Sequence, residues 1–228
     1  MRHEKSRHKV AQMFDRIAFK YDSMNRFLSL GQDMRWRKKM LKYLPKLDNY
    51  KIVDLATGTG DQIIAIKDLP AQFIGIDISK EMLKKAREKL QGDNRVELML
   101  GSALDIPLDN KSTDIVTMSF GIRNVSNPDE CIKEMVRILK NNGTALIMEF
   151  SKPSNRILRY ASSLYINKVV PWIGKKVCQS AYKYLPDTIE DFPSSKEFMK
   201  IMQDNGLINC RQISLNFGTV SLYIGEKR

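Results

Sequence analysis

The sequence predicts an α/β fold in which a mostly parallel sheet carries helices on both faces. Five short runs rich in β-branched and other hydrophobic residues recur between positions 52 and 150, and segments with apolar residues at helical spacing separate them. A glycine-containing loop follows the first run, as it does where α/β sheets bind ligands. Such alternation is typical of strand–helix–strand units with parallel strands. With 43% hydrophobic residues, the 228-residue chain can bury a large core.

The central region, residues 51–150, is expected to contain five strands and three helices. The strands are expected at residues 52–56, 73–77, 96–100, 114–120 and 144–150. The helices are expected near residues 61–69, 79–90 and 128–140. Ser79 is of the residue type that caps a helix N-terminus, and Asn142-Gly143 is of the type that ends a helix. This order of elements predicts a doubly wound, Rossmann-like core.

Two flanking regions extend this core. Residues 1–50 are expected to form a helical cap, with one or two helices over 8–44 and a break near Leu30-Gly31. Residues 191–228 are expected to form a helix at about 194–205 and two runs, 207–217 and 219–226, that pair antiparallel. These two runs complete a seven-stranded, mostly parallel sheet with an antiparallel terminal strand.

A basic, amphipathic insertion or lid is expected over residues 151–190. From Ser151 to Pro186 the chain holds seven Lys or Arg residues and no Asp or Glu, interleaved with hydrophobic and aromatic residues. The net charge of the whole chain is +12, and its basic surplus lies in the two flanks. Such asymmetry is typical of proteins with an anionic partner, either nucleic acid or a membrane surface, although solvated lysines alone also produce it.

Composition excludes several kinds of site. The only histidines, His3 and His8, lie near the N-terminus, and Cys131, Cys178 and Cys210 lack metal-ligand spacing. We therefore expect neither a metal site nor a His-based catalytic triad. No signal-peptide pattern and no run of about 18 apolar residues is present, so a cytoplasmic location is expected.

The loop after the first strand favours S-adenosylmethionine over a dinucleotide. Gly58 and Gly60 allow a ligand to approach the backbone, but Ile63 stands where a dinucleotide site would need a third glycine. Asp54 and Asp61 flank the loop, and carboxylates there would repel a pyrophosphate. S-adenosylmethionine lacks phosphate and carries a sulfonium and an ammonium group, which these acids tolerate or favour.

The next two strands provide further candidate cofactor residues. Asp77 ends the second predicted strand, 17 positions beyond Gly60, and is expected to accept hydrogen bonds from both ribose hydroxyls. Alternatively, Asp77 only caps the following helix, a role that Ser79 can also fill. Ser102 and Ala103, after the third strand, are expected beside the adenine edge.

Five strings of the chain resemble the quinone-biosynthesis C-methyltransferase family, which acts on demethylmenaquinone and on a ubiquinone precursor. They are Phe-Asp-Arg-Ile-Ala at 14–18, Tyr-Asp-Ser-Met-Asn at 21–25, Asp-Leu-Ala-Thr-Gly-Thr-Gly-Asp at 54–61, Ser-Phe-Gly-Ile-Arg-Asn-Val at 119–125 and Glu-Phe-Ser-Lys-Pro at 149–153. The resemblance implies a class I S-adenosylmethionine-dependent methyltransferase. It further implies that the cofactor contacts Thr59, Asp77, Ser102, Ala103 and Ser119. The chain departs from the family at Asp33 and Tyr223, where histidine is common, so no histidine-based role is expected.

This resemblance also suggests how the substrate ring is activated. A ring carbon of a quinol attacks a methyl group far more readily once a neighbouring hydroxyl is ionised. Arg123 and Asn124 are the expected catalytic residues, because a guanidinium can stabilise the phenolate and an amide can fix a ring oxygen. Arg123 could instead only brace its loop through a salt bridge. Tyr21 and Asn25 are expected to close over the ring, although Tyr21 could equally belong to the core, and no general base is assigned.

The expected partners follow from this chemistry. A prenylated quinol is the predicted substrate, most simply demethylmenaquinol, with a ubiquinone precursor as the alternative. Because the tail of this quinol is membrane-soluble, the basic insertion is expected to associate peripherally with an anionic membrane. A nucleic-acid substrate is disfavoured because residues 119–122 read Ser-Phe-Gly-Ile and not the Asn/Asp-Pro-Pro-Tyr string of base-amino methyltransferases. A non-enzymatic S-adenosylmethionine-binding regulator and a homodimer stay open.

Overall fold

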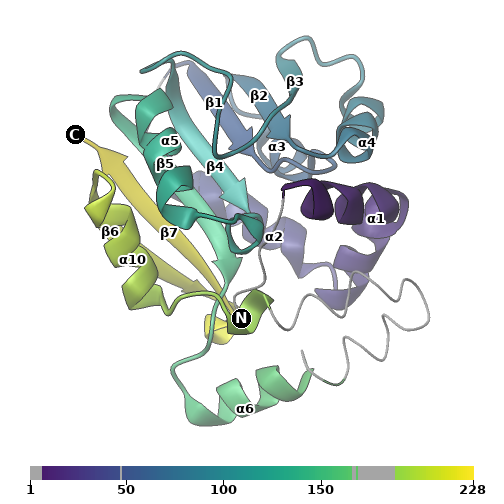
Figure 1. Ribbon diagram of the computed structural model, residues 1–228, viewed down its shortest axis with the longest axis vertical. Helices are drawn as coiled ribbons and strands as arrows, with labels where there is room; N and C mark the ends of the chain where they lie inside the picture. The colour runs from purple at the N-terminus through teal and green to yellow at the C-terminus, as the bar shows by residue number, and fades with distance from the viewer. Residues whose placement is uncertain (1–6, 47, 166–167, 169–187) are drawn as a thin grey trace.

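A computed structural model of the chain describes residues 7–46, 48–165, 168 and 188–228. Seven strands form one sheet in the order β3-β2-β1-β4-β5-β7-β6 (Figure 1). Their bounds are β1 Tyr50–Leu55, β2 Ala71–Asp77, β3 Val96–Leu100, β4 Thr113–Ser119, β5 Leu139–Phe150, β6 Leu207–Leu215 and β7 Val220–Lys227. Strands β1 to β5 pair parallel, whereas β7 pairs antiparallel with both β5 and β6. The predicted fold class is confirmed.

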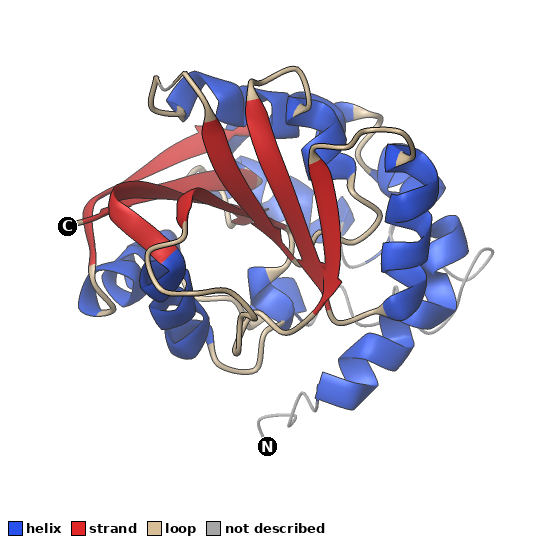
Figure 2. Ribbon diagram, turned by 90° about the horizontal axis from the view of Figure 1, so that it is seen from above, coloured by secondary structure: helices blue, strands red, loops and turns tan. Residues whose placement is uncertain are grey.

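Helices cover both faces of this sheet (Figure 2). They are α1 Arg7–Leu28, α2 Gln32–Lys39, α3 Asp61–Ile66, α4 Lys80–Leu90, α5 Pro128–Ile138, α6 Arg156–Leu164 and α10 Ser195–Asp204, with short 3-10 helices η1 Met40–Tyr43, η2 Ile122–Asn124 and η4 Asn216–Gly218. Because side chains alternate along a strand, neighbouring residues of β1 enter different cores. Val53 packs with Cys131 of α5, whereas Ile52 packs with Ile63 of α3. The parallel strands are thus buried on both faces, as doubly wound folds require.

The helix α1 lies across the carboxyl end of the sheet rather than on either face (Figure 1). Its Ile17 and Met24 form a separate hydrophobic cluster with Met82 of α4. The predicted break between the first two helices is confirmed: Leu30 and Gly31 have positive φ values of 52° and 72°. This break allows α2 to turn back toward α3, against which it packs.

Two predicted element boundaries are wrong for backbone reasons. The first strand ends at Leu55, because Ala56 has a left-handed φ of 50°. Asn142-Gly143 does not end a helix: α5 ends at Ile138, and Asn142, with φ 63°, lies inside β5 where its register with β4 shifts. A Cβ on Gly143 would meet the carbonyl oxygens of Lys140 at 2.9 Å and Asp114 at 3.0 Å. The pair therefore forms an irregularity within the strand.

The predicted basic insertion lies mostly outside the described residues. Within it, α6 is described, and Asn155 caps its N-terminus by accepting hydrogen bonds from the backbone of residues 157 and 158. The division of the chain into four segments at 50, 150 and 190 stays a prediction. No helix among the described residues is both long enough and apolar enough to span a membrane.

Candidate functional site

Three adjoining pockets lie where α1 crosses the carboxyl end of the sheet. The sheet-edge pocket is enclosed by α1, the ends of β1, β2 and β4, and the loop after β3. The loop pocket lies between the β1–α3 loop and α2, and the helical pocket is lined by α1, α2, α6 and the segment after β4. Tyr21 lines all three. The helical pocket has a volume of about 390 Å³ against about 90 Å³ for the sheet-edge pocket.

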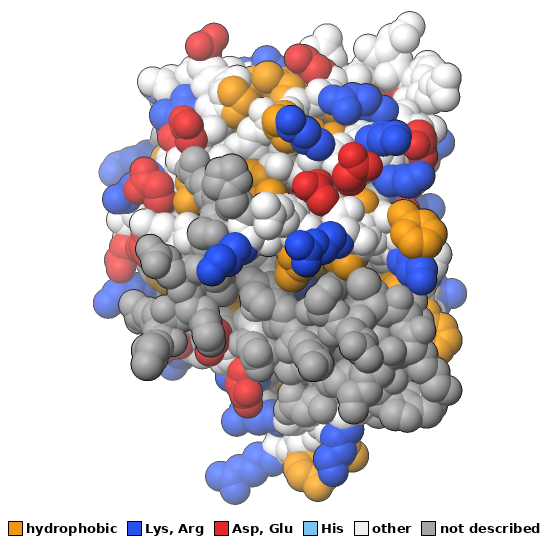
Figure 3. Space-filling view, turned by 45° about the vertical axis from the view of Figure 1, so that its right-hand side comes forward, with side chains coloured by type: hydrophobic (Ala, Val, Ile, Leu, Met, Phe, Trp, Pro, Cys, Tyr) orange, Lys and Arg blue, Asp and Glu red, His pale blue; other side chains and the backbone are white. Residues whose placement is uncertain are grey.

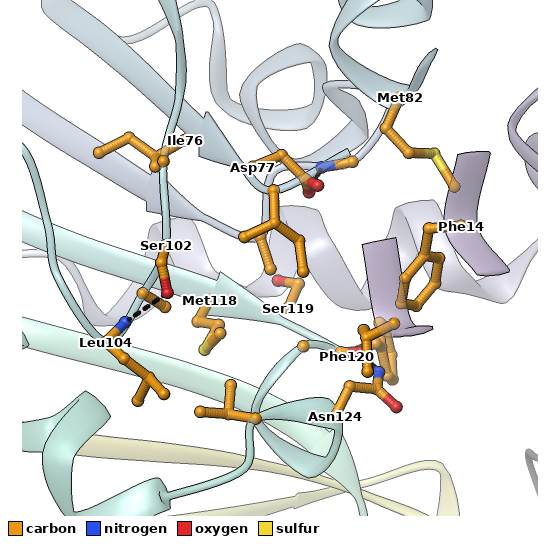
Figure 4. A pocket seen from close by; sticks show the side chains of 18 of the residues that line it. Phe14, Ile76, Asp77, Met82, Ser102, Leu104, Met118, Ser119, Phe120 and Asn124 are labelled. Carbon is orange, nitrogen blue, oxygen red and sulfur yellow. Dashed lines mark hydrogen bonds between the residues drawn. The ribbon is translucent and has the colours of Figure 1, made fainter. Parts of the chain in front are cut away.

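Nearly all the residues predicted from the sequence line these pockets. The sheet-edge pocket is lined by Gly58, Asp77, Ser102, Ala103 and Ser119, as Figure 4 shows for three of them. Asp54 and Thr59 line the loop pocket. The helical pocket is lined by Tyr21, Asn25, Arg123 and Asn124. The topology thus gathers side chains from separate parts of the chain at one edge of the sheet.

Gly60 is the exception, since it lines none of the three pockets formed by the described residues. Its φ of 83° places it in the left-handed region, where it precedes the first turn of α3. A Cβ at this position would lie 2.8 Å from Cδ1 of Leu90 on α4. Gly60 therefore serves the turn and the close packing of α3 against α4.

Asp77 joins the glycine loop to the start of α4. Its Oδ2 accepts a hydrogen bond from the backbone N–H of Gly58 and its Oδ1 one from that of Ser79, each at 2.8 Å. Ser79 itself caps α4 by accepting from the backbone of Met82, as predicted. Burial raises the pKa of Asp77 to about 6, although both backbone donors oppose this shift. Asp77 therefore organises the loop and also faces the sheet-edge pocket.

The side of the pocket beyond Asp77 is apolar. Ile76, Leu104 and Met118 line it (Figure 4). Ser102 is at its edge, where its Oγ accepts a hydrogen bond from the backbone N–H of Leu104 at 3.1 Å. The hydroxyl thus fixes the turn after β3. A flat aromatic group would fit between such apolar walls, with the backbone of this turn at its edge.

The loop pocket is polar and acidic. Asp54 is 1% exposed, and its Oδ1 accepts a hydrogen bond from Oγ1 of Thr117 at 2.7 Å. Burial raises the pKa of Asp54 to about 6. Ser119 donates a hydrogen bond to Oε1 of Gln62 at 2.9 Å, and Thr59 donates one to Oδ1 of Asp22 on α1 at 2.5 Å. The site therefore combines carboxylates with hydroxyl groups at the carboxyl end of β1.

An ionic network ties α1 to this loop. Lys89 of α4 forms ion pairs with Asp22 at 2.8 Å and with Asp61 at 2.5 Å. Arg26 of α1 pairs with Asp61 at 2.8 Å and also with Asp33 of α2. Although burial acts to raise it, these cations hold the pKa of Asp61 below its usual range. Asp61, which the sequence predicts beside the cofactor, therefore also helps to hold α1 over the pockets through these ion pairs.

Arg123 forms a buried ion pair that the sequence reasoning considered only as an alternative. Its Nη1 donates to Oε1 of Glu149 and to the backbone oxygen of Phe120, both at 2.7 Å. Glu149 is fully buried at the end of β5. Asn124 follows in the same short helix and lines both the sheet-edge and the helical pockets. The ion pair holds this segment between the two pockets, with Arg123 along the helical one.

Tyr21 lies at the junction of the pockets and also packs against the hydrophobic cluster of Ile17, Met24 and Met82. Its ring meets that of Phe14 edge to face, with centroids 6.1 Å apart. Burial raises the pKa of its hydroxyl, and Arg123 and a hydrogen bond with Asn25 oppose this shift. Tyr21 and Asn25 therefore lie together on the side of the helical pocket that α1 forms.

A family model described as the ubiE/COQ5 methyltransferase family matches residues 1–227. The chain belongs to this family. The ubiquinone/menaquinone biosynthesis C-methyltransferase UbiE of Geotalea uraniireducens is 41% identical over 226 residues, covering 96% of each chain. The demethylmenaquinone methyltransferase of Chlorobaculum tepidum is 37% identical, covering 98% of this chain and 94% of its own. The predicted methyltransferase class, with S-adenosylmethionine as methyl donor, agrees with this membership.

Solved structures resemble this ubiE/COQ5 family member in fold alone. An S-adenosylmethionine-dependent methyltransferase of Thermotoga maritima has a TM-score of 0.69 at 21% identity, covering 96% of this chain and all of the other. The [4+2]-cyclase SpnF reaches 0.71 at 13% identity, covering 97% of this chain and 96% of its own. Since a cyclase shares the fold, the activity has to be argued from the site.

The two departures from the family's histidines have different surroundings. Asp33 is buried, pairs with Arg26 and accepts a hydrogen bond from Oγ of Ser29 at 2.9 Å. Tyr223, on β7, shares a hydrogen bond with Oγ of Ser195 at 2.9 Å and lines none of the three pockets formed by the described residues. Asp33 therefore belongs to the ionic network of this family member, and Tyr223 to its core.

Three polar residues at the site were not predicted from the sequence: Arg37, Gln62 and Glu149. Glu149 stood in one of the family strings, but nothing in the sequence pairs it with Arg123. Arg37 had a detectable signal, because Trp36, Arg37 and Met40 have the i, i+1, i+4 spacing of one buried helix face. A charged residue on a buried helix face is rare unless it has a partner, so this spacing indicates that Arg37 interacts with another group.

Proposed function

We propose that this chain transfers the methyl group of S-adenosylmethionine to a ring carbon of a prenylated quinol, converting demethylmenaquinol to menaquinol. Menaquinone is common to the names of both relatives described above. The observation that carries the proposal is the helical pocket, which is large and opens beside the sheet-edge pocket. The two share Phe14, Tyr21, Phe120 and Asn124. A bulky, apolar acceptor and a nucleoside donor can thus meet at Tyr21.

The residues present fit S-adenosylmethionine. Asp77 would hold the ribose hydroxyls, the turn at Ser102 and Ala103 would hold adenine, and the acidic loop pocket would receive the charged amino-acid end beside Asp54 and Thr59. The amide of Gln62 would supply a donor at this end, since its Oε1 accepts from Ser119 and, among the described residues, its Nε2 has no hydrogen-bond partner. When bound, the cofactor supplies a methyl group activated by a positively charged sulfur.

The chain's own residues would prepare the acceptor ring. A fixed guanidinium stabilises an oxyanion without having to reorganise, and Arg123 is fixed by Glu149 and the Phe120 carbonyl. Asn124 would orient a ring oxygen, and Tyr21 and Asn25 would cover the ring. Aromatic Trp36 and Phe150 line the same pocket and would exclude water from the reacting carbon.

Peripheral membrane association is part of the proposal, and α6 supports it. Leu158, Ala161 and Tyr165 line the helical pocket, whereas Ile157 and Tyr160, on the same helix, are 79% and 74% exposed. Arg156 and Arg159 are exposed beside them. Figure 3 shows basic and hydrophobic side chains close together at the lower end of the molecule, where Figure 1 has α6. A helix of this kind suits the interface between headgroups and acyl chains.

The test is a methylation assay with purified protein, radiolabelled S-adenosylmethionine and reduced quinones in lipid vesicles. We expect label in the ring of menaquinol when demethylmenaquinol is supplied. Methylation of the ubiquinone precursor alone would replace the proposed substrate by the alternative. Label in tRNA or DNA, or cofactor binding without turnover on either quinol, would overturn the proposal in favour of a nucleic-acid enzyme or a regulator.

A further inference from the structure

Arg37 of α2 is a buried cation at the boundary of two pockets. It is 6% exposed and lines both the loop pocket and the helical pocket. Within the described residues, its Nε has no hydrogen-bond partner. The ion pairs of the surrounding network use Arg26 and Lys89 on one side and Arg123 on the other, but not Arg37. Arg37 therefore differs from each neighbouring cation.

Leaving a guanidinium buried without an anion is unfavourable, because desolvation of the charge is not offset by a partner. None of the nearby carboxylates forms an ion pair with Arg37 among the described residues. Asp61 pairs with Lys89 and Arg26, and Asp54 accepts from Thr117 through Oδ1, while its Oδ2 has no hydrogen-bond partner there. Arg37 acts on both acids at longer range, where it opposes the effect of burial on their pKa values. The guanidinium thus retains the capacity to bind an anionic ligand.

The position of Arg37 is also fixed. Its guanidinium carbon lies 5.6 Å from the centroid of the Phe120 ring, and the Trp36 ring packs against the same phenyl ring with centroids 6.2 Å apart. Such stacking orients the planar fork of an arginine, which matches the two oxygens of a carboxylate. The side chain is therefore pre-organised for a carboxylate that enters the loop pocket.

We infer that Arg37 binds the carboxylate of the methionine moiety of S-adenosylmethionine. The inference rests on the proposed placement of the cofactor, with its nucleoside in the sheet-edge pocket. Gly58 and Ser119 line both pockets, so a ligand that leaves the first enters the loop pocket between them. In the loop pocket, the carboxylates of Asp54 and Asp61 suit the ammonium group of the methionine moiety, and Arg37 suits its carboxylate.

A ligand that lacks the carboxylate provides the test. Calorimetry on the full chain compares S-adenosylmethionine with decarboxylated S-adenosylmethionine, in the unchanged protein and in Arg37→Gln. The unchanged protein should prefer the carboxylate ligand by roughly 10- to 100-fold. Arg37→Gln should lose this preference while binding the decarboxylated ligand as before. Arg35→Gln is the matched control, since Arg35 is exposed on the same helix.

Equal weakening of both ligands by Arg37→Gln would overturn the inference in favour of a structural role. Unchanged binding of both, together with a raised KM for the quinol, would assign Arg37 to the substrate instead and would also overturn it. If Arg37→Gln does not fold, Arg37→Lys keeps the charge without the planar fork and should reduce the preference for the carboxylate ligand only in part. Failure of the unchanged protein to distinguish the two ligands is decisive by itself. No quinol is needed, so the result is independent of whether menaquinol is the product.

Discussion

At the scale of single residues, two buried carboxylates make the site sensitive to pH. Asp54 and Asp77 are 1% and 7% exposed, and burial raises the pKa of each to about 6. In the proposed placement of the cofactor, Asp54 must be ionised to interact best with the cationic amino-acid end, and Asp77 with the ribose hydroxyls. Each is therefore a point at which protonation competes with cofactor binding.

We predict opposite effects of acid on binding and on stability. Affinity for S-adenosylmethionine should fall below pH 6 by up to about tenfold per pH unit for each carboxylate that must ionise. The folded pKa lies above the ordinary value of 3.8, so the contribution of these groups to the free energy of unfolding is present below about pH 4 and is lost as pH rises through 6. Calorimetry and urea unfolding at pH 5 and 7.5 measure both. An affinity that is constant over this range would contradict the prediction.

Asp77→Asn should weaken S-adenosylmethionine binding strongly. Two charge-assisted hydrogen bonds to ribose would be lost, at about 1.5–3 kcal/mol each. Asparagine keeps an acceptor for one of the two backbone donors, Gly58 or Ser79, whereas alanine keeps none, which makes asparagine the better probe. Calorimetry measures the change, with Glu81→Gln, an exposed acid in the first turn of α4, as the control. Unchanged affinity in a folded variant would disprove the ribose assignment.

Arg123→Lys should retain cofactor binding and lose most turnover. A lysine can still neutralise Glu149 but cannot reproduce the planar fork that also reaches the Phe120 carbonyl. Single-turnover assays at saturating cofactor separate the two effects. Near-normal turnover, with only the melting temperature lowered, would show that the ion pair braces the loop and does nothing further.

The sequence predicted the pocket-lining residues better than the interactions that hold them. Asp54, Gly58 and Asp77 were found because strand ends and a glycine loop have a local pattern. The pairing of Arg123 with Glu149 joins the end of β4 to the end of β5 and has no local signal. Gly60 was assigned to the ligand because its packing against Leu90 depends on the position of α4, which spacing alone does not supply.

At the scale of elements, α1 is held over the pockets by charges at one end and apolar contacts along its length. Lys89 joins α1 to α3 through Asp22 and Asp61, while Ile17 and Met24 pack against α4. Because α1 forms one wall of the sheet-edge pocket, movement of this helix would widen the pocket. Because the ion pairs that hold α1 are partly exposed, salt weakens them, and the movement of the helix should depend on ionic strength.

Lys89→Met should therefore loosen α1. Amide hydrogen exchange over residues 7–28 should accelerate, and S-adenosylhomocysteine should dissociate faster, because Asp22 loses its cation and Asp61 keeps only Arg26. Stopped-flow dissociation gives the rate. Lys85→Met is the matched control, since Lys85 pairs with Glu88 on the exposed side of the same helix. Equal exchange and dissociation rates in the two variants would rule out this role.

Elements with strong periodicity were predicted well, and their ends less so. The five parallel strands, the Ser79 cap and the break at Leu30 all occur as expected. Asn142-Gly143 was misread because its residue types suit a helix end and a strand irregularity equally. The close approach of Gly143 to the Asp114 carbonyl, which decides between them, exists only once β4 and β5 are paired.

At the scale of the whole molecule, the charge excess of +12 and the exposed face of α6 point to a negatively charged lipid surface. We predict that the protein sediments with anionic vesicles at low salt and is released at high salt, since each basic residue near the surface contributes roughly 1 kcal/mol. Replacing Ile157 and Tyr160 by Ser should weaken binding and slow methylation of a long-tailed quinol, while a tail-less analogue is methylated as before.

The matched control for this prediction is Phe19→Ser, which removes an exposed aromatic side chain from α1. It should leave vesicle binding unchanged. A wild-type protein that does not bind anionic vesicles even at low salt would refute membrane association and leave α6 as a wall of the helical pocket.

The position of β7 between β5 and β6 has a consequence for biosynthesis. Ribosomes deliver β1 to β5 first, yet among the described residues the outer edge of β5 pairs only with residues 220–226. Until that segment emerges, the backbone groups of β5 and the apolar face around Leu146 and Met148 lack the cover that β7 provides. The nascent chain therefore carries an unpaired strand edge from the completion of β5 until β7 emerges, and such an edge favours aggregation during that interval.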